Sequence, residues 1–238
     1  MAIAYNTSIV RSGLALHLDA ANPKSYPGSG TAWTDLSGNI RDGILTNGPT
    51  YSSLNSGSIV FDGTNDYVDV TNSNGFGEVN TAPTISLEIW ANISRKSGGG
   101  LQYQHIAGFR NDSNFDAYFL LLDASGAFVN TEARIRTASN AFDISINYIT
   151  YFDKWTHIVF TADSTRSDLY INGILLGSNT SVTGSFGASS SNFRIGQTTN
   201  AGNYPVKGNI SLVRFYNRAL SAIEVTQNFN ALRGRYGI

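Results

Sequence analysis

Apolar residues recur at every second position in several stretches of the chain. The longest such stretch is 85–93, where Ile85, Leu87 and Ile89 alternate with Ser86 and Glu88. Residues 14–19 follow the same period, with leucine at positions 14, 16 and 18. Successive side chains of a strand point to opposite faces of a sheet. Both stretches therefore predict strands that place one face on a core.

Similar short apolar stretches, separated by polar and glycine-containing segments, predict many more strands. They lie at 58–61, 67–70, 105–109, 117–122, 141–149, 155–162, 167–171, 174–178, 192–197 and 207–216. Asn172-Gly173 separates two of them, and this pair favours a type I′ turn because both central residues need a positive φ. The sequence thus predicts a hairpin at 167–178 within an all-β fold.

One segment near the end of the chain has helical character. Ser221 and Glu224 have the spacing of a capping box, and positions 223, 225, 229 and 232 form an apolar stripe. We expect a short helix that ends near Gly234. No linker-like segment or internal repeat divides the chain, so we expect a polar arm at 1–12 and one domain at 13–238.

Composition narrows the classes of partner. The 238 residues include no cysteine, which removes disulfides and thiolate metal sites from consideration. Lys and Arg total 16 against 17 Asp and Glu, and no basic cluster is present, so nucleic acid is not an expected partner. We also expect no signal peptide and no membrane-spanning segment, because no long apolar run occurs.

Several blocks occur in an order typical of one superfamily. They are GLALHLDAANPKSYPGSGTAWTDLSGN at 13–39, FDGTNDYVDV at 61–70, TISLEIWANI at 84–93, WTHIVFT at 155–161, DLYINGILLG at 168–177, FRIGQ at 193–197 and NISLVRFYNRALSAIEVTQNF at 209–229. Together they resemble the concanavalin A-like lectin/glucanase superfamily in its laminin G-like (LamG) branch. The resemblance implies a jelly-roll β-sandwich of two antiparallel sheets, followed here by the short C-terminal helix.

A softer resemblance concerns the ends of the chain. The opening and the ALRGRYGI ending resemble single-domain proteins of tailed phages, including cyanophages. In those phages such domains lie on the virion, so this resemblance implies a virion surface protein.

The residues do not favour catalysis. Glycoside hydrolases of this fold carry two glutamates with an aspartate between them on one strand face. The chain has four glutamates, and none has a carboxylate two positions away; they are Glu78, Glu88, Glu132 and Glu224. His17, His105 and His157 lie in or beside predicted strands, where a hydrogen-bonded structural role is the more common one. We therefore expect no enzyme.

One acidic segment is a candidate calcium site. Asp112, Asn114 and Asp116 place oxygen ligands at alternate positions, and Ca²⁺ needs six to eight such ligands. The resemblance implies calcium loops at one edge of the sandwich. The alternative is an ordinary turn, because Asp and Asn side chains bond their own backbone. The segment 62–66 is interpreted as a tight turn.

Sugar recognition needs an aromatic face beside a few polar groups. Aromatic residues in loop-like surroundings are Tyr26, Trp33, Tyr103, Phe115 and Tyr204. Tyr103 and Phe115 are the preferred ligand-binding candidates, since they lie near the acidic segment in the sequence. Each aromatic residue could instead fill the rim of the sandwich, and Trp33 resembles a core or rim tryptophan of the family.

These observations lead to a non-catalytic binding or structural module. We expect a phage virion surface protein, a capsid decoration or fibre subunit assembled in the host cytoplasm, with a lectin-like fold that binds glycans. The expected partners are other virion subunits, surface glycans and further copies of the chain, joined through edge strands. A free calcium-dependent lectin is the alternative, and a glycan-active enzyme is a remote one.

Overall fold

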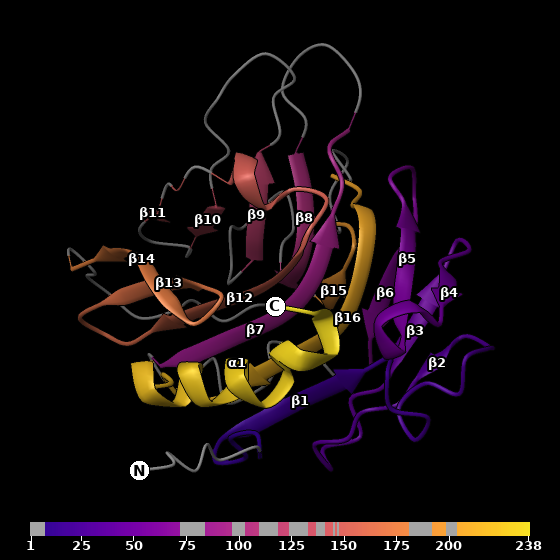
Figure 1. Cartoon of the computed structure of the whole chain (residues 1–238), viewed down its shortest axis with the longest axis horizontal. Coiled ribbons are helices and arrows are strands. Elements are labelled where there is room, and N and C mark those ends of the chain that lie inside the picture. Colours follow the sequence, from indigo (N-terminus) through magenta and orange to yellow (C-terminus); the bar gives the residue numbers. More distant parts are fainter. Residues whose placement is uncertain are drawn as a thin grey trace.

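The computed structural model describes residues 8–71, 84–96, 103–109, 119–123, 133–136, 141–144, 146, 148–180, 192–198 and 204–238. In these ranges the chain forms two antiparallel β-sheets that pack against each other. A single α-helix of the described part, α1 (Ala222–Tyr236), crosses the outside of one sheet (Figure 1). The predicted all-β sandwich with a C-terminal helix is confirmed.

The sheet beneath α1 is called sheet A. Its strand order is β14 (Ile174–Asn179), β13 (Ser167–Ile171), β12 (Trp155–Ala162), β7 (Ile85–Ile93), β16 (Lys207–Tyr216), β5 (Ser58–Asp62) and β4 (Thr50–Ser52), and β1 (Leu14–Asp19) also pairs with β16. The longest strands, β7 and β16, lie at its centre. Almost every residue of these two strands is buried.

The opposite sheet is called sheet B. Its order is β11 (Ala141–Asp143), β10 (Ala133–Arg136), β9 (Phe119–Asp123), β8 (Tyr103–Phe109), β15 (Phe193–Ile195), β6 (Tyr67–Val70), β3 (Gly43–Thr46) and β2 (Ala32–Trp33). Short 3₁₀ turns at Leu54–Ser56 and Ile149–Tyr151 complete the described elements. Strands distant in sequence are neighbours here, because β15 pairs with both β6 and β8.

The core lies between the sheets. Ile89 of β7 and Phe160 of β12 point into it from sheet A, and Val68 and Ile195 point into it from sheet B. Phe109 and Phe193 of sheet B pack edge to face with Phe215 of sheet A. The ring centroids of Phe109 and Phe193 are 5.1 Å apart, and the ring planes are inclined at 81°. Such edge-to-face packing joins the two sheets over one continuous apolar interior.

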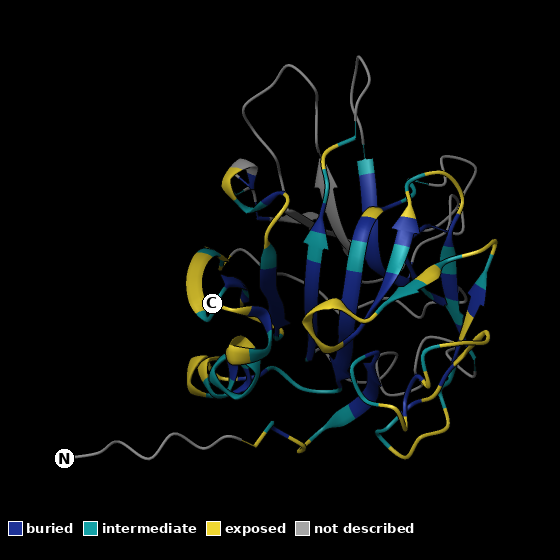
Figure 2. Ribbon diagram, turned by 45° about the vertical axis from the view of Figure 1, so that its right-hand side comes forward, coloured by how far each residue is buried: buried dark blue, intermediate teal, exposed yellow. Residues whose placement is uncertain are grey.

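Both faces of β7 are buried, although its sequence alternates like a half-exposed strand. Leu87 and Ile89 face the core, while Glu88 and Trp90 on the other face are 0% exposed. The cover is α1: the Trp90 ring stacks on Tyr236 at 4.1 Å and on Phe229 at 5.9 Å. Figure 2 shows the C-terminal helix at the left of the molecule, with exposed residues on its outer side and buried strands beside it.

The ends of α1 follow known capping rules. Ser221 Oγ accepts a hydrogen bond from Glu224 N, and Glu224 Oε2 accepts one from Ser221 N at 2.9 Å, which confirms the capping box. The helix runs past the predicted end to Tyr236 and stops at Gly237, whose φ is +73°. Among the described residues, no helix is both long and apolar enough to span a membrane.

Two details of the predicted helix were wrong. Ile223 was expected in the inward stripe but is 81% exposed, because it falls in the first turn on the solvent side. Gly234 does not end the helix, since a glycine at an interior position keeps helical dihedrals at a modest cost.

The predicted hairpin is confirmed. Asn172 and Gly173 join β13 to β14 with φ values of 52° and 77°. The strand expected at 141–149 was too long, because β11 ends at Asp143 and a 3₁₀ turn begins at Ile149. The sequence also missed β2, β3, β4 and β10, which are only two to four residues long and too short to show a period.

Part of the predicted arm packs on the chain itself. Val10 is 8% exposed and belongs to an apolar cluster with Tyr216 and Val225. Its backbone N donates to Asn228 Oδ1 at 2.8 Å. Residues 1–7 lie outside the described residues, so the division into an arm at 1–12 and a domain at 13–238 stays a prediction.

A buried carboxylate connects α1 to sheet A. Glu88 Oε1 accepts from His157 Nε2 and from Arg214 Nη1, each at 3.1 Å. Glu88 Oε2 lies 2.8 Å from Asn228 Nδ2 and 3.2 Å from Tyr216 Oη. We call these five residues the Glu88 cluster. It links β7, β12, β16 and α1 in the middle of the interface between sheet and helix.

The environment of Glu88 keeps it ionised. Burial by itself would raise the pKa of Glu88, but the positive charge of Arg214 and the hydrogen bonds from His157 and Tyr216 outweigh it and lower the pKa to about 2. On the neighbouring strand β1, burial and the charge of Arg214 lower the pKa of His17 to about 3. Glu88 is therefore ionised at neutral pH, whereas His17 is neutral.

Replacing the buried carboxylate should destabilise the protein strongly. Glu88→Gln leaves the Arg214 charge buried without its counterion, so we expect the free energy of unfolding in urea to fall by about 3–5 kcal/mol. Asp168→Asn breaks the more exposed pair with Arg166, whose Nε lies 2.7 Å from Asp168 Oδ1, and should cost about 1 kcal/mol or less. Equal losses for both variants would contradict a central role of Glu88.

Acid should weaken the fold through His17. Its pKa is lowered in the native state, so below its ordinary value of 6.5 the unfolded chain binds the additional proton and unfolding becomes easier. We expect His17 to reduce the free energy of unfolding by about 2 kcal/mol between pH 7 and pH 5. His17→Gln should remove that part of the pH dependence. Identical pH dependence in both proteins would show that His17 does not cause it.

Candidate ligand-binding surface

The outward face of sheet B carries polar and aromatic residues near its centre. Ile44 on β3 lies opposite Asp69 on β6, and Asp69 lies opposite Arg194 on β15. Tyr67, two residues before Asp69, lies opposite Thr46. The intervening residues face the core, so the period of two places this set on the outside. We call Ile44, Tyr67, Asp69 and Arg194 the sheet B patch.

The Arg194 side chain is held at several points. Its Nε donates to Asp69 Oδ1 at 2.7 Å, and its Nη2 donates to Asp69 Oδ2 at 3.3 Å. Its Nη1 donates to the carbonyl oxygen of Thr198 at 3.1 Å. The guanidinium carbon also lies 4.1 Å from the centre of the Tyr67 ring, a cation–π contact. These contacts fix the position of the guanidinium before any ligand arrives.

The patch remains accessible to solvent. The side chains of Arg194 and Asp69 are 18% and 28% exposed. Ile44 beside them is 46% exposed, which is high for a large apolar residue on a strand. A fixed donor group, a carboxylate and an apolar surface therefore lie side by side on one exposed sheet face. That combination suits a polar ligand with an apolar side.

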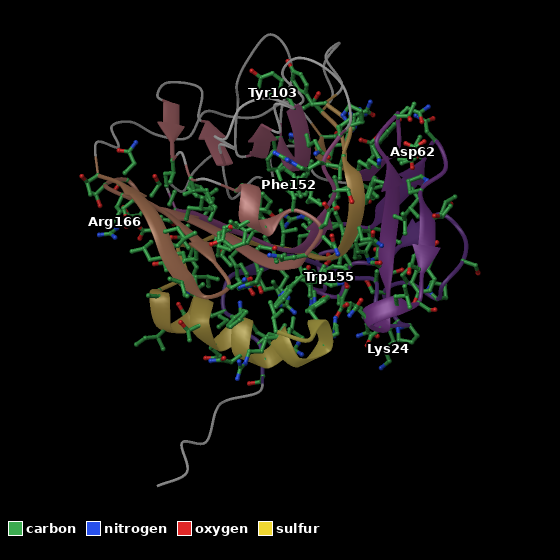
Figure 3. The ribbon with its side chains drawn as sticks, turned by 45° about the horizontal axis from the view of Figure 1, so that its top comes forward. Lys24, Asp62, Tyr103, Phe152, Trp155 and Arg166 are labelled. Carbon is green, nitrogen blue, oxygen red and sulfur yellow. The ribbon has the colours of Figure 1, made fainter. Side chains whose placement is uncertain are left out.

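The predicted ligand residue Tyr103 lies elsewhere. It is at the start of β8, at the end of the molecule away from α1 (Figure 3), and its ring lies 5.2 Å from that of Tyr204. Tyr103 pairs with Asp123, whereas Gly108 near the other end of β8 pairs with Phe119. By strand rise, Tyr103 and Phe109 lie about 20 Å apart at the two ends of β8.

The remaining residues of the predicted site lie in that segment, outside the described residues. They are Asp112, Asn114, Phe115 and Asp116. The calcium site and the role of Phe115 stay predictions. In the ranges that the structure covers, no group of three or more His, Asp or Glu could hold a metal ion.

Two other aromatic candidates are buried. Tyr26 is 4% exposed and donates its hydroxyl proton to the carbonyl oxygen of Gly30 at 2.8 Å. Trp33 is 0% exposed within the core, which agrees with its alternative interpretation as a core tryptophan. Neither side chain offers a free ring face for stacking on a sugar.

Two histidines and one glutamate of sheet A are also inaccessible to solvent. His17, Glu88 and His157 are 8%, 0% and 0% exposed and lie under α1. A substrate cannot reach these groups in the folded chain.

The sheet B patch was not predicted, because the ligand residues were expected in loops and the patch lies on strands. A signal was present, because Tyr67, Asp69 and Arg194 alternate with apolar residues in predicted strands, and the period of two places each of them on the outside of a sheet. What the sequence could not reveal is that β6 and β15 are adjacent, since Asp69 and Arg194 are 125 residues apart.

The chain resembles known proteins both in sequence and in structure. A family model described as "Concanavalin A-like lectin/glucanases superfamily" matches residues 62–226. No curated protein is similar enough in sequence to count as a match. The chain is similar to the binding domain of Botulinum Neurotoxin DC in complex with SialylT, with a TM-score of 0.70 and 15% identity over 93% of this chain and 52% of that one.

Two further solved structures are similar. Domain 4 of AbnA, a GH43 extracellular arabinanase from Geobacillus stearothermophilus, in complex with arabinotriose, has a TM-score of 0.64 and 20% identity over 91% of this chain and 98% of that domain. The binding domain of Paraclostridial Mosquitocidal Protein 1 has a TM-score of 0.69 and 16% identity over 93% of this chain and 52% of that one.

The chain spans about half the length of both toxin binding domains and nearly all of the arabinanase domain. At these identities the structural likeness shows a shared fold. The sequence match covers most of the chain and includes β6, β7, β12, β15 and β16. The chain therefore belongs to the concanavalin A-like lectin/glucanases superfamily, in its laminin G-like branch.

Proposed function

We propose that the chain is a non-catalytic carbohydrate-binding module, and that its ligand binds on the outward face of sheet B. The observation that carries the proposal is Arg194, held by Asp69, Thr198 and Tyr67 on an exposed surface. The fold supports it as well, since an arabinanase domain of this fold is titled as a complex with arabinotriose and a toxin domain as a complex with SialylT.

The geometry has a second interpretation, in which Arg194 and Asp69 form a cross-strand pair that only stabilises sheet B. Exposed pairs of this kind contribute roughly 0.2–1 kcal/mol. A stabilising pair needs neither a stacked tyrosine nor a third anchor at Thr198. These additional contacts restrict a side chain that would otherwise be mobile, as expected for a group that is positioned for a ligand.

A calcium-dependent version of the same function depends on Asp112, Asn114 and Asp116. The resemblance to laminin G-like domains supports it, and the described residues do not test it. The expected virion location, the virion partner subunits and a homo-oligomer also stay predictions, supported by the sequence resemblance to phage proteins and by the edge strands.

The purified chain should bind a subset of glycans on a broad array. Tyr67→Ala removes the ring beneath Arg194 and should weaken that binding by about tenfold, the equivalent of 1.4 kcal/mol. Tyr51→Ala, which removes a half-buried tyrosine on β4 of sheet A, serves as the control and should bind as the wild type does. Repeating the array in EDTA tests the calcium version.

If the wild-type chain binds no glycan on the array, the proposal of carbohydrate binding is contradicted. Loss of binding in EDTA, reproduced by Asp112→Asn, would support the calcium site. Unchanged binding in EDTA would remove calcium from the proposal and leave the sheet B patch as its basis.

A further inference from the structure

The described residues use only part of the hydrogen-bonding capacity of Arg194 and Asp69 in the sheet B patch. A guanidinium carries five N–H groups. The contacts of Arg194 with described residues use three of them, two on Asp69 and one on Thr198. Each carboxylate oxygen of Asp69 receives one hydrogen bond from Arg194 and can accept another. Within the part of the chain that the structure describes, two N–H groups of Arg194 and one acceptor position on each Asp69 oxygen remain available next to each other.

The charges of this pair cancel. Arg194 Nε and Asp69 Oδ1 are 2.7 Å apart, so an approaching anion meets attraction from one and repulsion from the other at similar distances. The patch has no net charge with which to favour an acidic ligand. A hydroxyl group suits the pair better, because it can accept from an N–H of Arg194 and donate to an oxygen of Asp69.

The shape of the patch adds a second requirement. The paired groups lie side by side across β6 and β15, so a ligand with hydroxyl groups on two adjacent carbons can bond to both at once and use more of their donors and acceptors than a single hydroxyl does. Ile44 lies opposite Asp69 on the next strand and is 46% exposed. It offers an apolar surface to the C–H groups of a sugar ring.

Resting on the proposed carbohydrate-binding function, we infer that the Arg194–Asp69 pair selects neutral saccharides with vicinal hydroxyl groups and discriminates against acidic ones. Arg194 donates to the hydroxyl oxygens, Asp69 accepts from the hydroxyl protons, and Ile44 packs against the ring. Asp69 is the residue that sets the selectivity, because its charge offsets that of Arg194.

The test compares three neutral trisaccharides, arabinotriose, xylotriose and maltotriose, with the acidic trigalacturonate. Dissociation constants are measured by calorimetry. The wild type should bind at least one neutral trisaccharide more tightly than trigalacturonate. Asp69→Asn preserves the shape of the side chain but leaves the Arg194 charge uncompensated. This variant should bind the neutral trisaccharide about tenfold more weakly and trigalacturonate about tenfold more tightly than the wild type does.

Two further variants complete the test. Arg194→Lys keeps the positive charge but loses the forked donor geometry, so it should weaken the neutral trisaccharide by about tenfold. Asp168→Asn breaks the Arg166–Asp168 pair on sheet A, which has the same 2.7 Å separation, and should leave all four dissociation constants unchanged. Arg166 lies at the edge of the molecule (Figure 3). Thermal unfolding midpoints confirm that each variant is folded.

The outcomes separate this inference from the proposed function. The inference is overturned if the wild type binds trigalacturonate more tightly than the neutral trisaccharides. It is also overturned if Asp69→Asn leaves the ratio of the acidic to the neutral dissociation constant unchanged. Carbohydrate binding stands in both cases. Binding of none of the four saccharides counts against the inference when the glycan array finds another ligand. If the glycan array shows no binding either, the same outcome counts against the proposed function.

Discussion

The ionised carboxylate of Glu88, buried at the centre of sheet A, determines how the rest of the molecule is arranged. A buried charge is tolerated only when a counterion and hydrogen bonds compensate for its lost hydration. Strand neighbours supply part of this compensation through Arg214, His157 and Tyr216. The remaining donor, Asn228, comes from α1. The helix must therefore lie across sheet A for the cluster to be complete.

This requirement distinguishes the two sheets. The outward face of sheet A is occupied at its centre, with Trp90 stacked on Tyr236 and Phe229 of α1. The outward face of sheet B instead carries Arg194, fixed by its neighbours and accessible to solvent. A rigid scaffold on one side and an exposed polar patch on the other fit a binding module. Glu88, which is 0% exposed and bonded to α1, serves the fold.

Local rules in the sequence identified the long strands, the Asn172-Gly173 hairpin and the capping box at Ser221. Each depends on residues a few positions apart, so each can be recognised without the fold. The function of Glu88 could not be predicted, because its partners lie 69 to 140 residues away. The alternation in β7 predicted an exposed outer face, and nothing in that stretch indicates that a distant helix covers it.

The candidate site shows the same limit. The preference for Tyr103 and Phe115 rested on closeness in sequence, whereas the structure describes Tyr103 at the start of β8, with its ring 5.2 Å from that of Tyr204, a residue about a hundred positions away. The sheet B patch depends on β15 pairing with β6, a contact between strands separated by 125 residues. Periodicity assigns each residue to a face of a sheet, and only the strand order shows which of these residues meet.

Mapping the bound saccharide by heteronuclear NMR tests the central claim most directly. With the tightest-binding trisaccharide, the account predicts that the largest shift changes fall on Ile44, Tyr67, Asp69 and Arg194. The amide of Glu88 and the indole of Trp90 should not change. Shift changes centred on α1 and sheet A, with none at Arg194, would contradict the assignment of ligand binding to sheet B.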